Sequence, residues 1–302
     1  MVESLVIENL ISKERKRFDM SEANYLIYEG SIDWGNVEVT HNTFQFPTQI
    51  GEYISSSVIG TRDISINGWI IGDCIEEINR KKKELSTFIN PMEEVRVIVD
   101  DYSIVSKPSS NVQFGKTLVD NSDVAVKFLI QLFCPQPLFL LTNAITVNVA
   151  DLVGGFGFPL IFKPEGIIMG YRKKSLFTDV TNNGALSVGM IITLEANGAV
   201  NNPEFLNAGT REGIKINKVL HLGEKVVIDT NIGERSVVGS IDGVESNYFK
   251  YMDYDSVWLQ LKNGTSVFTY RTYDSSGEQD ETYKNLTVNV SYKTAIYNLE
   301  GE

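Results

Sequence analysis

Apolar and polar residues alternate most clearly between residues 62 and 101 of the chain. Two runs there have the two-residue period of a strand with one buried face. Their apolar positions are Ile64, Ile66 and Ile70 in the first run, and Val95, Val97 and Val99 in the second. The residues between the runs have the spacing of a helix, so the pattern predicts a strand, a helix and a strand in succession.

The helix is predicted over residues 74–89. Asp73 can cap its first turn, and Glu76, three residues later, can reach back to close a capping box. Asn90-Pro91 ends the helix, because a residue before proline is disfavoured in helical geometry. Lys82 interrupts the apolar stripe, so we expect one face to pack on a sheet and the rest to meet solvent. The stripe consists of Ile75, Ile78, Leu85, Phe88 and Ile89.

A further strand is predicted over residues 124–133. Because large apolar residues occupy both of its faces, with Phe128 on one and Phe133 on the other, we expect it to lie inside a sandwich. The segment Cys134-Pro-Gln-Pro137 then ends the sheet, because neither proline has an N–H to donate. We place a domain boundary there, which gives domains 1–137 and 138–302.

The second half of the chain consists of short β-branched and aromatic runs between turn signals. These signals are Asn182-Asn-Gly184, Asn197-Gly198, Asp242-Gly243, Asn263-Gly264 and Ser276-Gly277. About ten strands at this spacing indicate an antiparallel sandwich or jelly roll. The clearest predicted hairpin runs from Trp258 through Leu261, turns at Asn263-Gly264 and returns through Tyr270.

Charge and composition narrow the function classes. The chain has 302 residues, 42% of them hydrophobic, and a formal net charge of −12. This acidity argues against nucleic-acid binding through the overall field. Cys74 and Cys134 form neither a disulfide framework nor a zinc motif, which fits a reducing compartment. We expect no signal peptide and no membrane-spanning segment.

No pattern in the sequence predicts catalysis, a cofactor or a metal site. His41 and His221 are the only histidines, and no third residue can be placed with either to form a triad. The pair Asp253 and Asp255 lacks the glycine and glutamate of a calcium loop. No Lys-Ser/Thr follows Gly154-Gly-Phe-Gly157, so a phosphate loop is not indicated. Four aromatic residues are the remaining candidates for a binding site: Trp258, Tyr248, Tyr251 and Tyr254. They could form a sugar-stacking platform, or Trp258 could belong to the core.

Several short marks, in order along the chain, together resemble the distal tail protein family of long-tailed phages, the siphovirus-type tail components. The N-terminal marks are Tyr28-Glu29-Gly30, Trp34, Arg62-Asp-Ile-Ser-Ile-Asn-Gly68 and Ile89-Asn-Pro91. The C-terminal marks are Phe156-Gly-Phe-Pro159, Asn201-Asn-Pro203-Glu-Phe-Leu-Asn207, Val227-Ile-Asp-Thr230 and the segment from Asp255 to Gly264. The resemblance covers most of the chain.

The resemblance implies a mainly β protein without enzymatic activity. Its N-terminal domain would be a split-barrel β-domain with one α-helix and a hairpin, and its C-terminal domain a galectin-like β-sandwich. Six N-terminal domains would close into a ring with a central channel for DNA. The ring would join the tail tube to the tail-associated lysin or baseplate hub, while the outer domains carry or face receptor-binding components. The protein would assemble in the host cytoplasm and reside at the virion tail tip.

Two residues are candidates for the ring interface. Arg62 and Trp69 combine an arginine and a large aromatic on a strand beside a partly wet helix, as interface anchors often do. The alternative is that Trp69 belongs to the core and Arg62 to an internal salt bridge.

Two other function classes stay open. The C-terminal sandwich could act as a carbohydrate-binding adhesin for the bacterial cell wall, or the chain could hydrolyse peptidoglycan. Galectins carry a His-x-Asn-x-Arg strand and a Trp-x-x-Glu-x-Arg strand, whereas here Leu-Gly follows His221 and Leu-Gln-Leu follows Trp258. We therefore expect no β-galactoside binding.

Overall fold

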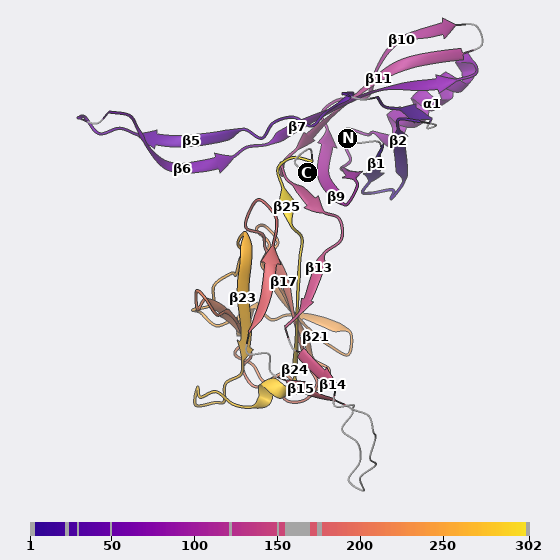
Figure 1. The fold of residues 1–302 in the computed structure, drawn as a ribbon. Helices are drawn as coiled ribbons and strands as arrows, with labels where there is room; N and C mark the ends of the chain where they lie inside the picture. The colour runs from indigo at the N-terminus through magenta and orange to yellow at the C-terminus, as the bar shows by residue number, and fades with distance from the viewer. Residues whose placement is uncertain are drawn as a thin grey trace. The chain divides into compact units, whose positions relative to one another are not determined.

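The computed structural model divides into two compact units (Figure 1). It describes residues 4–21, 24–28, 30–48, 50–120, 123–149, 151–154, 170–173 and 177–299. The first unit comprises residues 1–142 and 295–302, and the second comprises residues 143–294. The division into a ring-forming domain 1–137 and a sandwich 138–302 stays a prediction.

The first unit is a barrel-like sheet with one helix. Seven strands close on themselves in the order β11, β7, β3, β2, β1, β8 and β9, because β9 also pairs with β11. The bounds of these strands are β1 Ser4–Asn9, β2 Arg15–Asp19, β3 Tyr25–Leu26, β7 Arg62–Gly72, β8 Val95–Val99, β9 Tyr102–Pro108 and β11 Asp123–Cys134. Strands outside this path are β4 Ile32–Asp33, β10 Gln113–Asp120, β12 Phe139–Leu141 and β25 Ala295–Ile296. The predicted split-barrel β-domain with one helix is confirmed.

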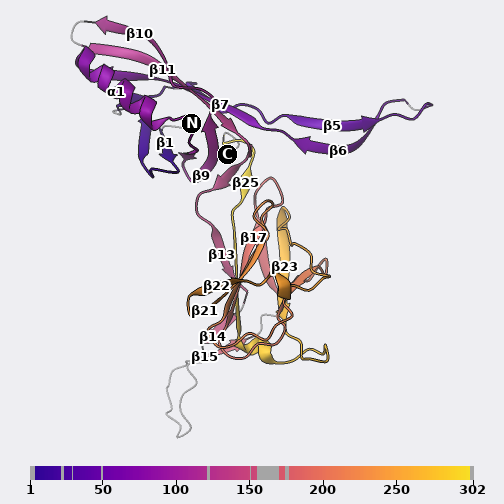
Figure 2. The same cartoon turned by 180° about the vertical axis from the view of Figure 1, so that it is seen from behind.

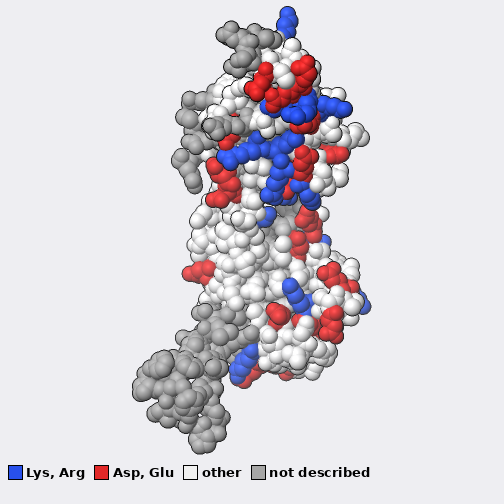
Figure 3. All heavy atoms as spheres, turned by 90° about the vertical axis from the view of Figure 1, so that its right-hand side faces the viewer, with Lys and Arg blue, Asp and Glu red and all other residues white. Residues whose placement is uncertain are grey.

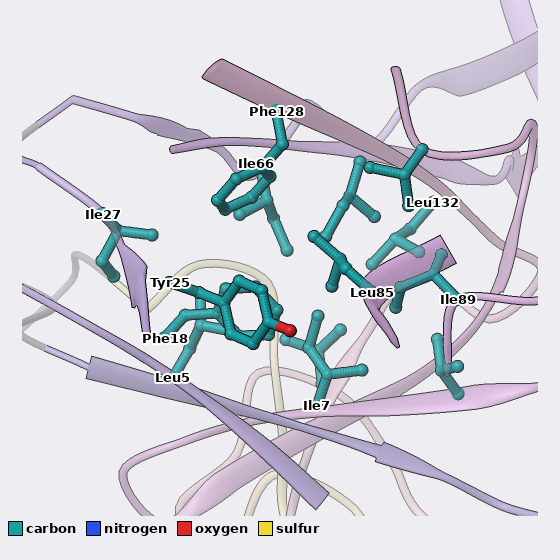
Figure 4. Packing of buried hydrophobic residues seen from close by; sticks show 14 of the residues in the cluster. Leu5, Ile7, Phe18, Tyr25, Ile27, Ile66, Leu85, Ile89, Phe128 and Leu132 are labelled. Carbon is teal, nitrogen blue, oxygen red and sulfur yellow. The ribbon is translucent and has the colours of Figure 1, made fainter. Parts of the chain in front are cut away.

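The alternating residues of the sequence form the core of this barrel. Ile64, Ile66, Val95 and Val97 are buried, and the side chains in Figure 4 point toward one another from β1, β2, β7, β11 and the helix. At Gly68 an added Cβ would lie 2.4 Å from the Phe128 ring and 2.5 Å from the Leu26 carbonyl oxygen. Only glycine therefore lets the Phe128 ring pack across β7.

The helix α1 spans Ile75–Phe88, within one residue of the prediction at each end. The predicted cap is wrong, because the N-cap residue is Cys74 and no side chain caps the helix. Instead, Glu77 accepts a hydrogen bond from the Asp73 backbone N–H at 3.0 Å, one residue later than the predicted Glu76. Lys81 lies in the buried stripe, where its Nζ bonds Glu77 at 2.9 Å and the Ile71 carbonyl at 2.7 Å. Lys81 thus links α1 to β7 through the Ile71 carbonyl.

Strand β11 does not lie inside a sandwich as predicted. Its residues Val124, Val126, Phe128, Ile130 and Leu132 are buried. The opposite face, which carries Phe133, is half-buried or exposed, with Phe133 itself 38% exposed. A barrel strand has one inner and one outer face. The prediction was wrong because the apolar residues of the outer face do not make it a second buried face.

The chain returns to the first unit after the second unit is complete. Strand β25 pairs with β12, with Phe139 opposite Ile296 and Leu140 opposite Ala295. Ala295 is buried, and Ile296 packs on the core of the first unit. The second unit is therefore an insertion between two neighbouring strands of the first.

The second unit is an antiparallel β-sandwich, as predicted. One sheet has the order β13, β24, β17, β20, β21 and β22, the other has the order β16, β23, β18 and β19, and a single apolar core lies between them. The strands are β13 Ile145–Asn148, β16 Thr178–Asn182, β17 Met190–Ala196, β18 Glu204–Asn207, β19 Gly213–Lys215, β20 Lys225–Asp229, β21 Ser236–Ile241, β22 Val244–Asn247, β23 Gly264–Arg271 and β24 Leu286–Tyr292. A separate ladder joins β14 Asp151–Gly154 to β15 Gly170–Lys173, and two 3-10 helices are η1 Phe249–Tyr251 and η2 Thr282–Asn285.

The predicted hairpin around Asn263-Gly264 is wrong. The residues before the turn form no strand, and Leu261 makes only an isolated bridge to Val188. Strand β23 instead pairs with β16 and β18. The family mark Phe156-Gly-Phe-Pro159 lies outside the described residues.

Candidate assembly interface

A long hairpin projects from the first unit without covering any of its core. It consists of β5 Val39–Phe44 and β6 Tyr53–Ile59, which among the described residues pair only with each other (Figures 1 and 2). Every residue of both strands is exposed. An isolated two-stranded hairpin is marginally stable in water, so this arm needs a surface to pack on.

The outer part of the arm carries an aromatic cluster. Phe44 and Tyr53 lie opposite each other with stacked rings, centroids 5.6 Å apart. Phe46 meets both rings edge-on, at 5.3 Å from Phe44 and 6.2 Å from Tyr53. These three side chains and Ile54 are still 46% to 61% exposed. The cluster therefore presents apolar surface that the described part of the chain does not cover.

The middle of the arm is polar. The His41 Nδ1 and Ser57 Oγ lie 2.8 Å apart, and the Asn42 amide donates to Ser56 Oγ at 2.8 Å. These cross-strand pairs stiffen the hairpin between its apolar ends. At its base the Gly60 N–H bonds the Glu38 carbonyl at 2.7 Å, where β6 leads into β7. Only residues 60 and 61 separate β6 from β7, so the arm joins the barrel through a short connection.

Arg62, a predicted interface residue, is buried in the first unit, with 1% of its surface exposed. Its guanidinium lies 4.9 Å from the centre of the Phe139 ring, and Nη2 donates a hydrogen bond to the Tyr297 carbonyl. Burial lowers the pKa of this guanidinium. Its Nε and Nη1 have no hydrogen-bond partner among the described residues. These contacts hold the returning segment against β7 and favour the internal alternative, although no salt bridge to Arg62 occurs among the described residues.

Trp69, the second predicted interface residue, is half-buried on β7. The Nζ of Lys127, its register partner on β11, lies 4.9 Å from the centre of its ring. The ring thus lies on the outer side of the barrel, covered in part by a lysine. Its role in an interface stays a prediction.

The family resemblance implied a hairpin in the N-terminal domain, but the residue pattern did not locate it at residues 39–59. Its strands lack a clean alternation of apolar and polar residues, because the run Ser55-Ser-Ser57 interrupts the apolar positions. The signal available was the closeness of Phe44, Phe46 and Tyr53 on either side of the turn signal at Gly51. Large apolar residues on both sides of a short turn indicate a hairpin that meets another surface.

The residues weighed for catalysis lie apart. His41 is on the arm of the first unit, whereas His221 is in the second unit, where its backbone N–H bonds Glu224. Cys134 is buried, and burial raises the pKa of its thiol to about 12, so it is protonated at neutral pH. Among the described residues no group of three histidines, cysteines or acids could hold a metal ion. Of Gly154-Gly-Phe-Gly157, all but the first residue lie outside the described residues.

Charged side chains of both signs lie next to one another on the face shown in Figure 3. The basic run at residues 13–17 follows this rule. Glu8 bonds Arg15 at 2.9 Å and Arg96 at 3.2 Å, and Arg17 bonds Asp19 at 2.7 Å. The hydrogen bond from Arg15 holds the pKa of Glu8 below its ordinary value. Neutralised in this way, the run makes a poor phosphate-binding patch. No helix in the described part of the chain is long and apolar enough to cross a membrane.

Two family models match the two halves of the chain. Residues 18–134 match the family described as phage tail protein RIFT-related domain, and residues 183–293 match siphovirus-type tail component, C-terminal domain. Together these matches span well over half of the chain. A search of curated proteins found no match.

A solved structure shares the fold, and a second shows a weaker likeness. The first is the Dit protein (gp 19.1) of SPP1, described as a hub of the adsorption apparatus in phages that infect Gram-positive bacteria. It has a TM-score of 0.63 at 12% sequence identity, and the match covers 96% of this chain and 98% of that chain. A chain of the phage P2 baseplate in its activated conformation has a TM-score of 0.49 at 13% identity, over 97% and 98%. With both family matches in place along one chain, this protein belongs to the siphovirus-type tail component family, the distal tail proteins of phages.

Proposed function

We propose that this chain is a ring-shaped adaptor, or hub, of a phage tail. Six copies close into a ring through their first units, and the ring surrounds a channel for DNA. The ring joins the tail tube to the tail tip, where it meets the lysin or baseplate hub and the receptor-binding parts. The number of copies and these partners are what the family resemblance implies.

The observation that carries the proposal is the exposed arm of β5 and β6. Burying a large apolar side chain stabilises a protein by about 1.5–3 kcal/mol relative to exposing it. Phe44, Phe46, Tyr53 and Ile54 offer several such gains, on the order of the 4–15 kcal/mol that association costs.

A second copy of the chain is the simplest occupant of the arm's surface. The arm and the barrel are different surfaces, so an arm on the next barrel makes a head-to-tail contact, which can repeat until the ring closes. Closure also protects the free edge of β10, which pairs only with β11 along its own sheet.

The test is negative-stain electron microscopy of the full chain, with mass photometry on the same sample. We expect closed six-fold rings from the wild type and monomers from a Phe44→Ser, Tyr53→Ser variant. Because both side chains are exposed in one copy, the thermal midpoint of the monomer should not change. A matched control, Ile232→Ser with Val244→Ser, removes exposed apolar side chains from the second unit and should leave rings intact.

Two results would contradict the proposal. One is a wild type that stays monomeric at the highest concentrations and with added tail tube protein. The other is a ring that forms equally well with the altered arm.

We further propose that the chain is not an enzyme and that it assembles in the host cytoplasm before residing at the virion tail tip. Both rest on the family, whose members are structural tail components. Zymography on bacterial cell walls should show no clearing by the purified chain. A cleared zone would restore the hydrolase alternative.

A further inference from the structure

A hollow of about 350 Å³ opens on the second unit, beside the paired strands β21 and β22. Both strands are labelled in Figure 2. Its lining includes Arg235, Ser236, Glu245, Asn247 and Phe249. This volume is at the small end of the range for ligand pockets, about 300–1,000 Å³. The hollow therefore suits a ligand of one or two rings.

One wall of the hollow is an exposed aromatic side chain backed by a second. Phe249 is 54% exposed, and its ring stacks on Trp258 with centroids 6.2 Å apart and planes inclined by 23°. The Arg235 guanidinium lies 5.6 Å from the centre of the same Trp258 ring. Trp258 in turn packs on the sandwich core. The sequence suggested a platform of Trp258 and three tyrosines, but the ring that stacks on Trp258 belongs to Phe249.

The backbone around this wall is fixed. The Phe249 N–H bonds the Asn247 side chain at 2.8 Å. Tyr248, between them, is buried, and a Cβ added at Gly239 would lie 2.2 Å from its ring. Only glycine at 239 lets Tyr248 reach the core, which anchors the hollow's edge to the sandwich. The aromatic surface is thus ordered before any ligand arrives, which limits the entropy lost on binding.

Polar groups of both kinds face the same hollow. Arg235 supplies N–H donors, Glu245 supplies carboxylate acceptors, and Ser236 has a hydroxyl that does both. In the part of the chain that the structure describes, the side chains of Arg235 and Glu245 have no ion-pair or hydrogen-bond partner, although Arg235 lies over the Trp258 ring. Their hydrogen-bonding capacity is therefore available to a ligand.

We propose that this hollow binds a neutral saccharide of one or two pyranose rings, such as bacterial cell walls expose. The apolar C–H face of a pyranose packs on the Phe249 ring, while its hydroxyls accept from Arg235 and donate to Glu245. A phosphate-bearing ligand fits less well, because Glu245 offsets the attraction of Arg235 for it and the chain carries a net charge of −12. The site lies wholly in the second unit and does not depend on ring formation.

The test is ligand-observed saturation-transfer NMR, followed by titration calorimetry, on the full chain. The probes are glucose, N-acetylglucosamine, rhamnose, lactose, soluble fragments of bacterial cell walls, and glycerol 3-phosphate as the anionic probe. We expect a neutral saccharide to bind with a Kd of about 1 mM. Lactose should not bind, because both galectin motifs are absent.

Variants locate the binding. Phe249→Ala should weaken it about fivefold to tenfold through lost ring contact, and Glu245→Ala should weaken it by a similar factor. Tyr254→Ala is the matched control, since Tyr254 is fully exposed in the same unit and does not line the hollow, and should leave the Kd unchanged. Thermal midpoints should be unchanged in all three variants, because each altered side chain is exposed.

The inference is wrong if no neutral saccharide or wall fragment binds at about ten times that concentration. It is equally wrong if Phe249→Ala leaves the Kd unchanged or if glycerol 3-phosphate binds more tightly than any neutral probe. Rings should form normally with Phe249→Ala, so failure of this site is distinguishable from failure of the adaptor proposal.

Discussion

Glu224 is a carboxylate with no exposed side-chain surface in the second unit. It accepts a hydrogen bond from Lys218 Nζ and another from the His221 backbone N–H at 3.0 Å. Lys218 also lies 5.0 Å from the centre of the Tyr248 ring. Burial by itself raises the pKa of Glu224, but the hydrogen bonds from Lys218 and His221 outweigh it, so the pKa lies below its ordinary 4.5. The carboxylate is therefore ionised in the folded state at neutral pH.

This pair predicts how stability depends on pH. Because the folded pKa of Glu224 is depressed, its contribution is present above pH 4.5 and is lost as pH falls through the folded pKa. The pKa of Lys218 is raised, since the bond to Glu224 outweighs burial, so its contribution is lost as pH rises beyond 10.5. Urea unfolding of the second unit should show a plateau between these limits. Glu224→Gln should lower its stability by about 3 kcal/mol, because the lysine keeps its burial and loses its partner.

The matched control is Glu281→Gln, which removes a similar pair with Lys284 on the surface. Both of its side chains are more than half exposed, so water replaces the interaction and the urea midpoint should not change. Equal effects of the two substitutions would show that burial does not set the strength of the Lys218–Glu224 pair.

At the residue scale the sequence predicted the core better than the exceptions to it. Alternation identified Ile64, Ile66, Val95 and Val97 as buried, because one face of each strand packs on the core while the other faces water. It places Arg62 on the face of Ile64 and Ile66, but it could not show that the backbone carbonyls of Ile71 and Tyr297 accept from the buried Lys81 and Arg62. Carbonyl groups belong to every residue, so a sequence cannot show which of them will accept.

At the scale of elements, local signals placed α1 within one residue, and turn signals predicted about ten short strands in the half of the chain that forms the sandwich. Pairings between distant strands could not be read in the same way. Nothing around Phe139 signals that its neighbour is Ile296, because short apolar strands pair with many partners equally well. The residue pattern did not locate the arm for a different reason. Neither of its strands has a buried face within the described residues, so apolar and polar residues need not alternate along them.

The returning strand β25 predicts the effect of a truncation. A chain that ends after Thr294 loses the pairing with β12 and the Tyr297 carbonyl, the one acceptor among the described residues for the buried Arg62 guanidinium. An unpaired buried donor costs about 1–3 kcal/mol, and more for a charged group. Hydrogen exchange of β12 and β7 should therefore accelerate. Exchange in the second unit should not change, since its ladders lie within residues 145–292.

A truncation after Leu299 is the control, because it keeps β25 and Tyr297. It should exchange like the full chain. Rapid exchange throughout both units in the shorter truncation would instead mean that the two units unfold as one.

At the scale of the whole molecule, charge repulsion opposes apolar contact between copies in the proposed ring. Each copy carries a net charge of −12, so copies repel at low salt, whereas the arm contributes apolar contact. Raising NaCl from about 0.01 M to about 1 M shortens the Debye length from about 30 Å to about 3 Å. The fraction of rings in mass photometry should therefore rise with salt. A fall would indicate that ion pairs, and not the arm's apolar residues, hold neighbouring copies together.

Because the second unit is inserted between β12 and β25, these two paired strands are synthesised at different times. The ribosome must add the 152 residues of the second unit after β12 before it reaches the strand that pairs with β12. At about 5–20 residues per second this takes about 8–30 s, during which the first unit lacks a strand and Arg62 lacks its carbonyl partner. A nascent chain that stalls within the sandwich has all seven barrel strands, but its β12 lacks the partner strand β25. The order of strands along the chain thus makes β25 the last strand that the first unit receives.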